Sequence, residues 1–218
     1  MKAMILAAGR GDRLRPLTDT TPKPLLEVRG KPLIIHHLER LRSAGYSDIV
    51  INISWLGDKI KNYLGDGARY GVRILYSEEP AGALDTGGGI LNALPVLGSD
   101  PFLVVNGDIY TDYPFMNLGS ALKRGDLAHL VMVKNPPHHP EGDFCLSFDG
   151  RLSTDGELRL TYSGIGIHDP LFFKDCNPGR FPMLPWWQEA MRKRRVSGQM
   201  YSGVWNDIGT IEALRAAS

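Results

Sequence analysis

Short runs of apolar residues rich in valine and isoleucine alternate along the chain with longer segments whose apolar positions recur every three or four residues. This alternation of strand-like and helix-like segments favours an α/β fold, with a mainly parallel sheet covered by helices. The expected strands are residues 3–8, 48–53, 72–76, 102–106 and 127–133. The expected helices are residues 32–44, 56–64, 88–94, 185–195 and 211–217.

The pattern changes after residue 134, where a turn-rich segment, residues 135–143, carries three prolines and a glycine. Strand-like residues 144–148 and 158–168 follow, and we expect them to form a small extension of the sheet over the ligand. No repeat or low-complexity linker divides the sequence. Residues 1–218 are therefore predicted to form one domain with a mixed, mainly parallel sheet, which binds ligands beyond the carboxyl ends of its strands.

Composition narrows the range of partners. A chain of 218 residues with 43% hydrophobic content can bury a proper core. The 25 basic and 24 acidic residues nearly balance, so neither a nucleic-acid partner nor an acidic tail is indicated. The apolar run at the amino terminus is too short for a membrane span or a signal peptide, so we expect a cytoplasmic protein without a membrane partner. Cys145 and Cys176 lack zinc-site spacing and are interpreted as free thiols.

A glycine turn with spaced cations follows the first expected strand. Gly9 and Gly11 allow the backbone to approach a ligand with its N–H groups, and Arg13 and Lys23 supply positive charge, which together indicate a bound polyanion. The turn lacks both the Gly-Lys-Ser/Thr of a P-loop and the third glycine of a dinucleotide fingerprint, since Leu14 stands there. The alternative from these glycines alone is an ordinary turn between strand and helix.

Two aspartates far apart in the chain are candidate metal ligands. Asp108 follows the expected strand 102–106, and Asp207 lies in the motif Trp-Asn-Asp-Ile-Gly-Thr. Either aspartate alone would be interpreted as a turn or cap residue. Together, beside a polyphosphate, they indicate Mg²⁺, which typically takes one or two carboxylates and completes its coordination with phosphates and waters.

The string Leu-Ala-Ala-Gly-x-Gly-x-Arg-Leu-x-Pro-Leu-Thr, followed by Pro-Lys-Pro, resembles the signature of the sugar-1-phosphate nucleotidyltransferases. The resemblance implies a single-domain, Rossmann-like nucleotidyltransferase fold. It also implies that the glycine loop wraps a triphosphate, that Arg13, Lys23 and Asp108 are catalytic, and that Asp108 and Asp207 bind the metal. The nucleotide-binding residues that it implies in the loop are Ala8, Gly9, Arg10, Gly11, Asp12, Arg13 and Lys23.

The same resemblance assigns a base pocket and a sugar pocket. Residues 78–89 contain three consecutive glycines and match the segment that holds the nucleobase, with Glu79, Gly82, Gly87 and Gly88 as the implied contacts. For these glycines considered alone, a clash-free helix start stays open as an alternative. The implied sugar-binding residues are Asn106, Gly142, Asp143 and Tyr162.

The expected chemistry needs no general base. A sugar 1-phosphate, by analogy with phosphorylated hydroxyls, has a second pKa near ~6 and is already anionic at neutral pH. Catalysis then consists of aligning two anions and stabilising charge at the α-phosphate and the leaving pyrophosphate. The six histidines are accordingly interpreted as structural, and His138 and His139 as loop residues.

The sequence lacks the Glu-Lys-Pro of thymidylyl- and glucose-uridylyl-type relatives and has Tyr-Ser-Gly-Ile-Gly near that place. With Pro-x-His-His-Pro-x-Gly-Asp-Phe, this resembles the N-acetylmuramate-1-phosphate uridylyltransferases of peptidoglycan recycling. The expected reaction converts UTP and N-acetyl-α-muramate 1-phosphate into UDP-N-acetylmuramate and pyrophosphate, with Mg²⁺. The alternatives are mannose 1-phosphate with GTP, glucose 1-phosphate with UTP or dTTP, and a silent nucleotide-sugar sensor. The sequence does not identify protein partners.

Overall fold

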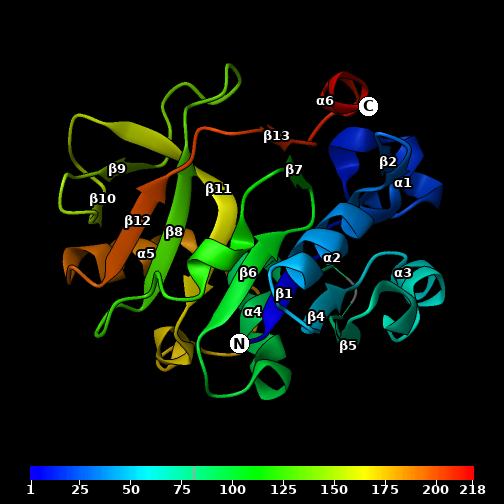
Figure 1. Ribbon diagram of the computed structural model, residues 1–218, viewed down its shortest axis with the longest axis horizontal. Coiled ribbons are helices and arrows are strands. Elements are labelled where there is room, and N and C mark those ends of the chain that lie inside the picture. Colours follow the sequence, from blue (N-terminus) through cyan, green and yellow to red (C-terminus); the bar gives the residue numbers. More distant parts are fainter. Residues whose placement is uncertain (81) are drawn as a thin grey trace.

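The computed structural model describes residues 1–80 and 82–218, and Figure 1 shows a central sheet with helices around it. Within these residues the main sheet contains β1 (Ala3–Leu6), β4 (Asp48–Ile53), β5 (Arg73–Glu78), β6 (Phe102–Asn106), β8 (Ala128–Val133), β9 (Phe144–Leu146), β10 (Leu152–Ser153), β11 (Arg159–His168) and β12 (Val196–Met200). Two ribbons pair β2 (Glu27–Val28) with β3 (Lys31–Pro32) and β7 (Ile109–Thr111) with β13 (Trp205–Asp207). The α-helices are α1 (Leu17–Thr20), α2 (Leu33–Ser43), α3 (Gly57–Leu64), α4 (Asp85–Leu97), α5 (Leu184–Arg192) and α6 (Ile211–Ala217).

The strand order reverses at β1. This strand pairs in parallel with β4 on one side and β6 on the other, and β4 pairs in parallel with β5. The chain therefore builds outward from β1 to β5 and then returns through α4 to place β6 on the far side of β1. In open α/β sheets, the crevice beyond the strand ends at such a reversal is the usual ligand site.

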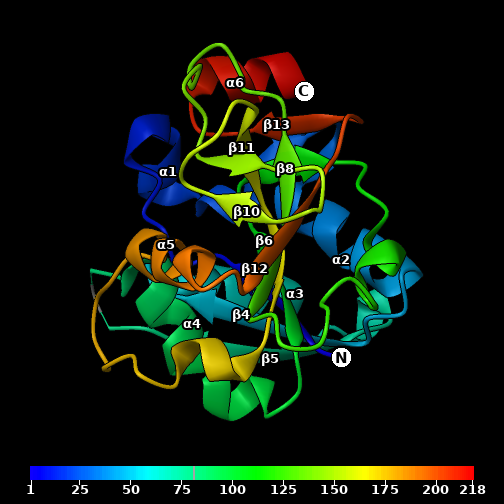
Figure 2. The ribbon, with the colours of Figure 1, turned by 90° about the vertical axis from the view of Figure 1, so that its left-hand side faces the viewer.

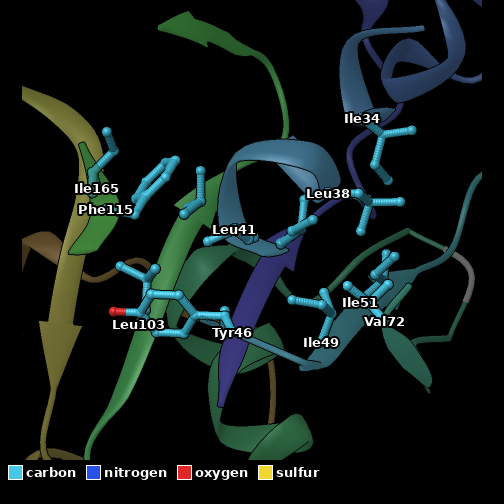
Figure 3. Packing of buried hydrophobic residues seen from close by; sticks show 14 of the residues in the cluster. Ile34, Leu38, Leu41, Tyr46, Ile49, Ile51, Val72, Leu103, Phe115 and Ile165 are labelled. Atoms are coloured by element: carbon cyan, nitrogen blue, oxygen red, sulfur yellow. The ribbon is translucent and has the colours of Figure 1, made fainter. Parts of the chain in front are cut away.

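Helices cover both faces of the sheet, with α2 on one side and α4 and α5 on the other (Figure 2). Ile34, Leu38 and Leu41 recur at helical spacing along α2 and pack on one face of the sheet (Figure 3). Along β4, Ile51 faces this cluster, whereas the next residue back, Val50, belongs to the cluster that contains α4 and α5. Burial on both faces explains why the strands read as continuous apolar runs.

The observed helices and strands confirm the expected α/β fold class. β4 and β6 match the expected strands 48–53 and 102–106, and α6 matches 211–217. The helix expected at 88–94 begins earlier, at Asp85, so the three glycines lie inside α4 instead of leading into it. β12 was not expected, because its sequence Val-Ser-Gly-Gln-Met has no apolar run; it forms by pairing in parallel with β8.

The extension expected after residue 134 is built on β11, which is antiparallel to both β6 and β8. Its register with β8 shifts between Tyr162 and Ile165, next to Gly164 with a φ of +81°. Such a bulge bends a strand and redirects its side chains. The first residues of β11 pair with β9, which pairs in turn with β10, and this small sheet continues the main one.

Two features bear on the expectations from composition. In the described part of the chain, Cys145 is buried and Cys176 is partly buried, and both are free thiols. α4 has 13 residues, shorter than the roughly 20 that cross a bilayer. Among the described helices none combines the length and the apolar composition of a membrane span.

A buried histidine makes stability depend on pH. His168 is fully buried, and burial lowers its pKa from 6.5 to about 3. The unfolded chain takes up this proton near pH 6.5, so the free energy of unfolding falls as the pH drops from 6.5 toward 3. Glutamine at this position keeps an acceptor for the Trp187 indole N–H, which donates to His168 Nε2 at 3.2 Å.

We therefore expect the loss of unfolding free energy between pH 7 and pH 5 to be about 1–2 kcal/mol smaller in His168→Gln than in the wild type. Urea titrations at the two pH values measure it. Equal pH dependence in the two proteins would contradict a neutral buried imidazole.

Candidate active site

Two neighbouring cavities open at the crevice between β1 and β6, with volumes of about 260 and 400 Å³. Asn106 and Asp108 line both of them. Of the residues expected in the site, the smaller cavity adds Ala8, Gly9, Lys23 and Glu79. The larger adds Arg13, Tyr162 and Asp207. Two cavities that share the Asp108 carboxylate suit the binding of two molecules that react with each other.

The segment after β1, residues 7–22 with the short helix α1 inside it, is called the phosphate loop for its expected ligand. It turns at Gly11, whose φ of +73° favours glycine. Thr18 Oγ1 donates to the Gly11 carbonyl at 2.9 Å, and Leu14 is fully buried beneath the loop. At the crevice itself, the Gly107 amide donates to the Leu6 carbonyl at 2.9 Å, and a Cβ at residue 107 would lie 2.5 Å from that oxygen. The backbone turns of both strands are therefore fixed around the site.

Lys23 and Asp108 form an ion pair across the smaller cavity. Lys23 Nζ lies 2.7 Å from Asp108 Oδ2, and the lysine side chain is only 11% exposed. The lysine is held by the single turn Lys23–Leu25 that follows Pro22. The ammonium pairs with the carboxylate at this depth, and it is also placed to meet an incoming phosphate.

Asp207 reaches the same place from the far end of the chain. β13 runs antiparallel to β7, and the Ile208 amide donates to the Asp108 carbonyl at 2.8 Å. Burial raises the pKa of Asp207, and the negative charge of Asp108 raises it further. The two carboxylates are thus close enough to repel each other, which is the arrangement that the sequence motifs predicted.

The donor set fits a hard divalent cation such as Mg²⁺. A bound cation would relieve the unfavourable charge of Asp207 beside Asp108, and Mg²⁺ commonly takes only one or two carboxylates. Over the described residues, no group of three or more histidine, cysteine, aspartate or glutamate side chains is arranged to hold a metal alone. Asp108 and Asp207, which both line the larger cavity, are the carboxylates that would hold such an ion.

Glu79 organises the loop between β5 and α4. Its Oε1 accepts from Asn52 Nδ2 at 2.6 Å, and its Oε2 accepts from the Leu84 amide at 2.7 Å. Asn52 in turn accepts from the Ala7 amide at 2.7 Å. This chain of hydrogen bonds ties the start of α4 to the end of β1. A polar Asn inside the apolar strand β4 is the sequence signal for this network.

Gly87 and Gly88 occupy a different environment from the expected one. Both amides donate to the Phe181 carbonyl, at 3.0 and 3.2 Å, and both glycines are buried. A Cβ at residue 87 would overlap the Phe181 ring, and one at residue 88 would overlap the Gly179 carbonyl oxygen. In this structure their amides hold the 179–181 segment. A direct contact between these amides and a base stays a prediction.

Residues just before these glycines have positive φ angles. Ala83 and Asp85 are non-glycine residues at φ +54° and +62°, and Gly82 is at +101°. Such conformations cost energy and tend to persist where the surroundings impose them. Ala83, Asp85 and Thr86 line the smaller cavity, and the sequence analysis had not named them.

The larger cavity is walled by β11 and the 135–143 loop. Asn106 and Tyr162 line it as expected. Asp143 is not among the described residues that line this cavity; its carboxylate accepts from the Tyr162 amide at 2.7 Å and contacts His139 Nε2 at 3.1 Å. Gly142 is buried at a φ of +61° and also lies outside the lining. Roles of Gly142 and Asp143 in binding sugar stay predictions.

Two histidines lie in the site, although the sequence analysis interpreted them as loop residues. His138 and His139 both line the larger cavity. His138 Nε2 lies 3.9 Å from Asp207 Oδ2. The Pro-Pro-His-His-Pro segment was visible in the sequence, but nothing in it indicated that the loop folds back over Asp207.

Four residues that the sequence assigned to nucleotide binding are not part of either cavity lining. Within the described chain, Arg10, Gly11 and Asp12 line neither cavity, and neither does Gly82. The Arg10 guanidinium lies instead over the ring of Trp55. Their assignment to nucleotide binding stays a prediction.

The family profile described as nucleotidyl transferase matches residues 2–149. The chain belongs to this family. The nucleotidyltransferase is 55% identical, over 100% of its length and 96% of the relative's, to a Neisseria meningitidis serogroup B protein named N-acetylmuramate alpha-1-phosphate uridylyltransferase. A Caulobacter vibrioides protein of the same name is 36% identical, over 99% of this chain and 94% of its own.

A solved structure shares the fold of the nucleotidyltransferase. It is a putative glucose-1-phosphate thymidylyltransferase from Bacillus anthracis in complex with sucrose, with a TM-score of 0.87 and 23% identity. The match covers 100% of this chain and 93% of that one. The family match and the two named relatives show that the protein is an enzyme, and the solved structure shows that it has the single α/β fold of the nucleotidyltransferases.

Proposed function

We propose that the enzyme transfers the uridylyl group of UTP to N-acetyl-α-muramate 1-phosphate, giving UDP-N-acetylmuramate and pyrophosphate. The observation that carries the reaction class is the meeting of the two cavities at Asp108, with Lys23 on one side and Arg13 and Asp207 on the other. The choice of acceptor is supported by the names of the relatives that align along nearly their whole length.

Each cavity takes one substrate in this proposal. UTP lies in the smaller cavity, with its triphosphate on the loop around Gly9 and its base beside Asp85 and Thr86. The sugar phosphate lies in the larger cavity against Tyr162. The acceptor phosphate then reaches the α-phosphate of UTP near Asp108, where the two cavities join.

The chain's own residues align and neutralise the two anions. Arg13 and Lys23 offset the charge that repels the acceptor from the triphosphate, and the fixed loop amides hold the phosphates in line. Asp108 and Asp207 would hold Mg²⁺. When bound, this ion supplies positive charge at the α-phosphate and the leaving pyrophosphate. A histidine base is unnecessary, because the attacking phosphate is already anionic.

The chemistry of the larger cavity suits a muramate. The lactyl group of a muramate adds a carboxylate that glucose and mannose lack, so this acceptor needs further hydrogen-bond donors. His138 and His139 line the cavity beside Arg13. His139 Nε2 is already engaged by Asp143 Oδ1 at 3.1 Å, so His138, whose side chain is 60% exposed, is the histidine left to donate to the lactyl carboxylate.

A panel assay tests the proposal. UTP, dTTP and GTP are each combined with Mg²⁺ and the 1-phosphates of N-acetylmuramate, N-acetylglucosamine, glucose or mannose, and pyrophosphate release is measured. We expect the highest kcat/KM for UTP with N-acetylmuramate 1-phosphate. A higher value for GTP with mannose 1-phosphate would reassign the substrates, and no release from any pair would favour a silent sensor.

The wider setting follows from this reaction. We propose that residues 1–218 act as one nucleotidyltransferase domain in the cytoplasm, where UTP is available. The product is a nucleotide sugar that carries muramate, so the enzyme would return this sugar to cell-wall precursors during peptidoglycan recycling.

A further inference from the structure

We propose that Arg10 and Trp55 form a single positioning unit that holds the phosphate loop in the shape required by the nucleoside triphosphate. The inference rests on the proposed binding of a triphosphate by this loop. It gives Arg10 a role other than the direct phosphate contact that the family resemblance implies.

The position of the Arg10 guanidinium carries the argument. Its central carbon lies 3.6 Å from the centre of the Trp55 ring, which is close cation–π contact. Nη2 of Arg10 lies 3.2 Å from Asp19 Oδ1, and Nε lies 3.5 Å from Asp12 Oδ1. Two carboxylates of the loop itself thus pair with Nη2 and Nε, and the tryptophan covers the planar face, while Nη1 is buried without a hydrogen-bond partner among the described residues.

Trp55 comes from outside the loop, between β4 and α3. Its indole N–H donates to the Thr18 carbonyl at 2.9 Å, so one side chain contacts the loop at two points. Lys59, in the first turns of α3, adds a third contact by donating to the Thr20 carbonyl at 2.5 Å. The segment from β4 to α3 thus acts as a support for the outer side of the phosphate loop.

This support has a consequence for binding. The loop amides must already point at the phosphates if binding is not to spend free energy on ordering the loop. Removal of either member of the unit would free the same part of the loop. The losses from the two substitutions should therefore overlap, whereas an Arg10 that touched phosphate independently of Trp55 would give losses that multiply.

A double-mutant cycle tests the inference. Arg10→Ala, Trp55→Ala and the double variant are compared with the wild type by calorimetric binding of UTP with Mg²⁺, and by the KM for UTP and for the acceptor. We expect each single variant to weaken UTP binding about tenfold, and the double variant to weaken it by little more. The KM for the acceptor should stay within about twofold.

Two further variants serve as controls for the double-mutant cycle. Arg69 also lies over an aromatic ring, 4.6 Å from the centre of Tyr70, but outside the phosphate loop, so Arg69→Ala controls for loss of a stacked arginine and should leave UTP binding unchanged. Trp55→Phe keeps a ring under Arg10 but loses the donor to Thr18, and should fall between the wild type and Trp55→Ala. It also gives a folded variant if the alanine substitution unfolds the protein.

The opposing outcomes are distinct. A roughly hundredfold loss in the double variant would overturn the inference and make Arg10 an independent phosphate ligand. Parallel losses in UTP affinity, acceptor KM and thermal midpoint would also overturn it, by showing a general structural defect. Calorimetry with UTP needs no sugar acceptor, so a wrong acceptor in the proposed function would leave this test intact.

Discussion

Asp207→Asn is expected to lower kcat/KM by about 100-fold or more while leaving the thermal midpoint unchanged or slightly raised. The pKa of Asp207 is raised, first by burial and then by the negative charge of Asp108, so its ionised form is unfavourable in the folded protein without a cation. Asparagine removes that unfavourable charge and, with it, a ligand for the metal. Turnover and stability should therefore move independently.

Asp108→Asn should behave differently. It also removes a carboxylate from the proposed metal site, but it leaves the Lys23 ammonium, only 11% exposed, without its partner at 2.7 Å. We expect turnover and the thermal midpoint to fall together in this variant, because an unpaired buried charge is costly. Asp100→Asn, at an exposed position, is the surface control.

Pyrophosphate release and thermal unfolding of the three variants measure these effects. Wild-type turnover in Asp207→Asn would contradict the metal assignment. A large drop in its midpoint would instead show that Asp207 is a structural ion-pair partner. Magnesium titration of UTP binding then separates loss of the ion from loss of the nucleotide.

Gly88→Ala is expected to destabilise the folded protein by about 1–3 kcal/mol, the usual cost of forcing extra atoms into a packed site. A Cβ on this residue would overlap the Gly179 carbonyl oxygen, and the same turn of α4 donates to the Phe181 carbonyl. The clash is with backbone, so the 179–181 segment must move away from α4.

Gly119→Ala is the matched control. Gly119 has helical angles, φ −55° and ψ −28°, and the nearest atoms to an added Cβ are 3.9 Å away. Alanine should be neutral or slightly stabilising there, because it restricts the unfolded chain. Chemical denaturation of both variants measures the difference. Equal stability of the two would mean that the 179–181 segment yields at no cost, and that the glycine run has another purpose.

The positions of the core strands and of the local motifs could be predicted from sequence. Continuous apolar runs located β4 and β6, and the spacing of Ile34, Leu38 and Leu41 located α2. Both signals are local, since they depend on which face of one element is buried. The glycine turn and the two aspartate motifs were equally local, and the structure brings Asp108 and Asp207 together as expected.

The sequence alone thus determined the α/β class, the phosphate loop and the pair of acidic motifs, because each is written within a few neighbouring residues. Only the tertiary structure decided which groups meet across the fold: the Gly87 and Gly88 amides with Phe181, Arg10 with Trp55, and His138 with Asp207. Such contacts depend on how separate segments pack. No local sequence pattern specifies which distant residue will accept a hydrogen bond, cover a side chain or fill the space beside a glycine.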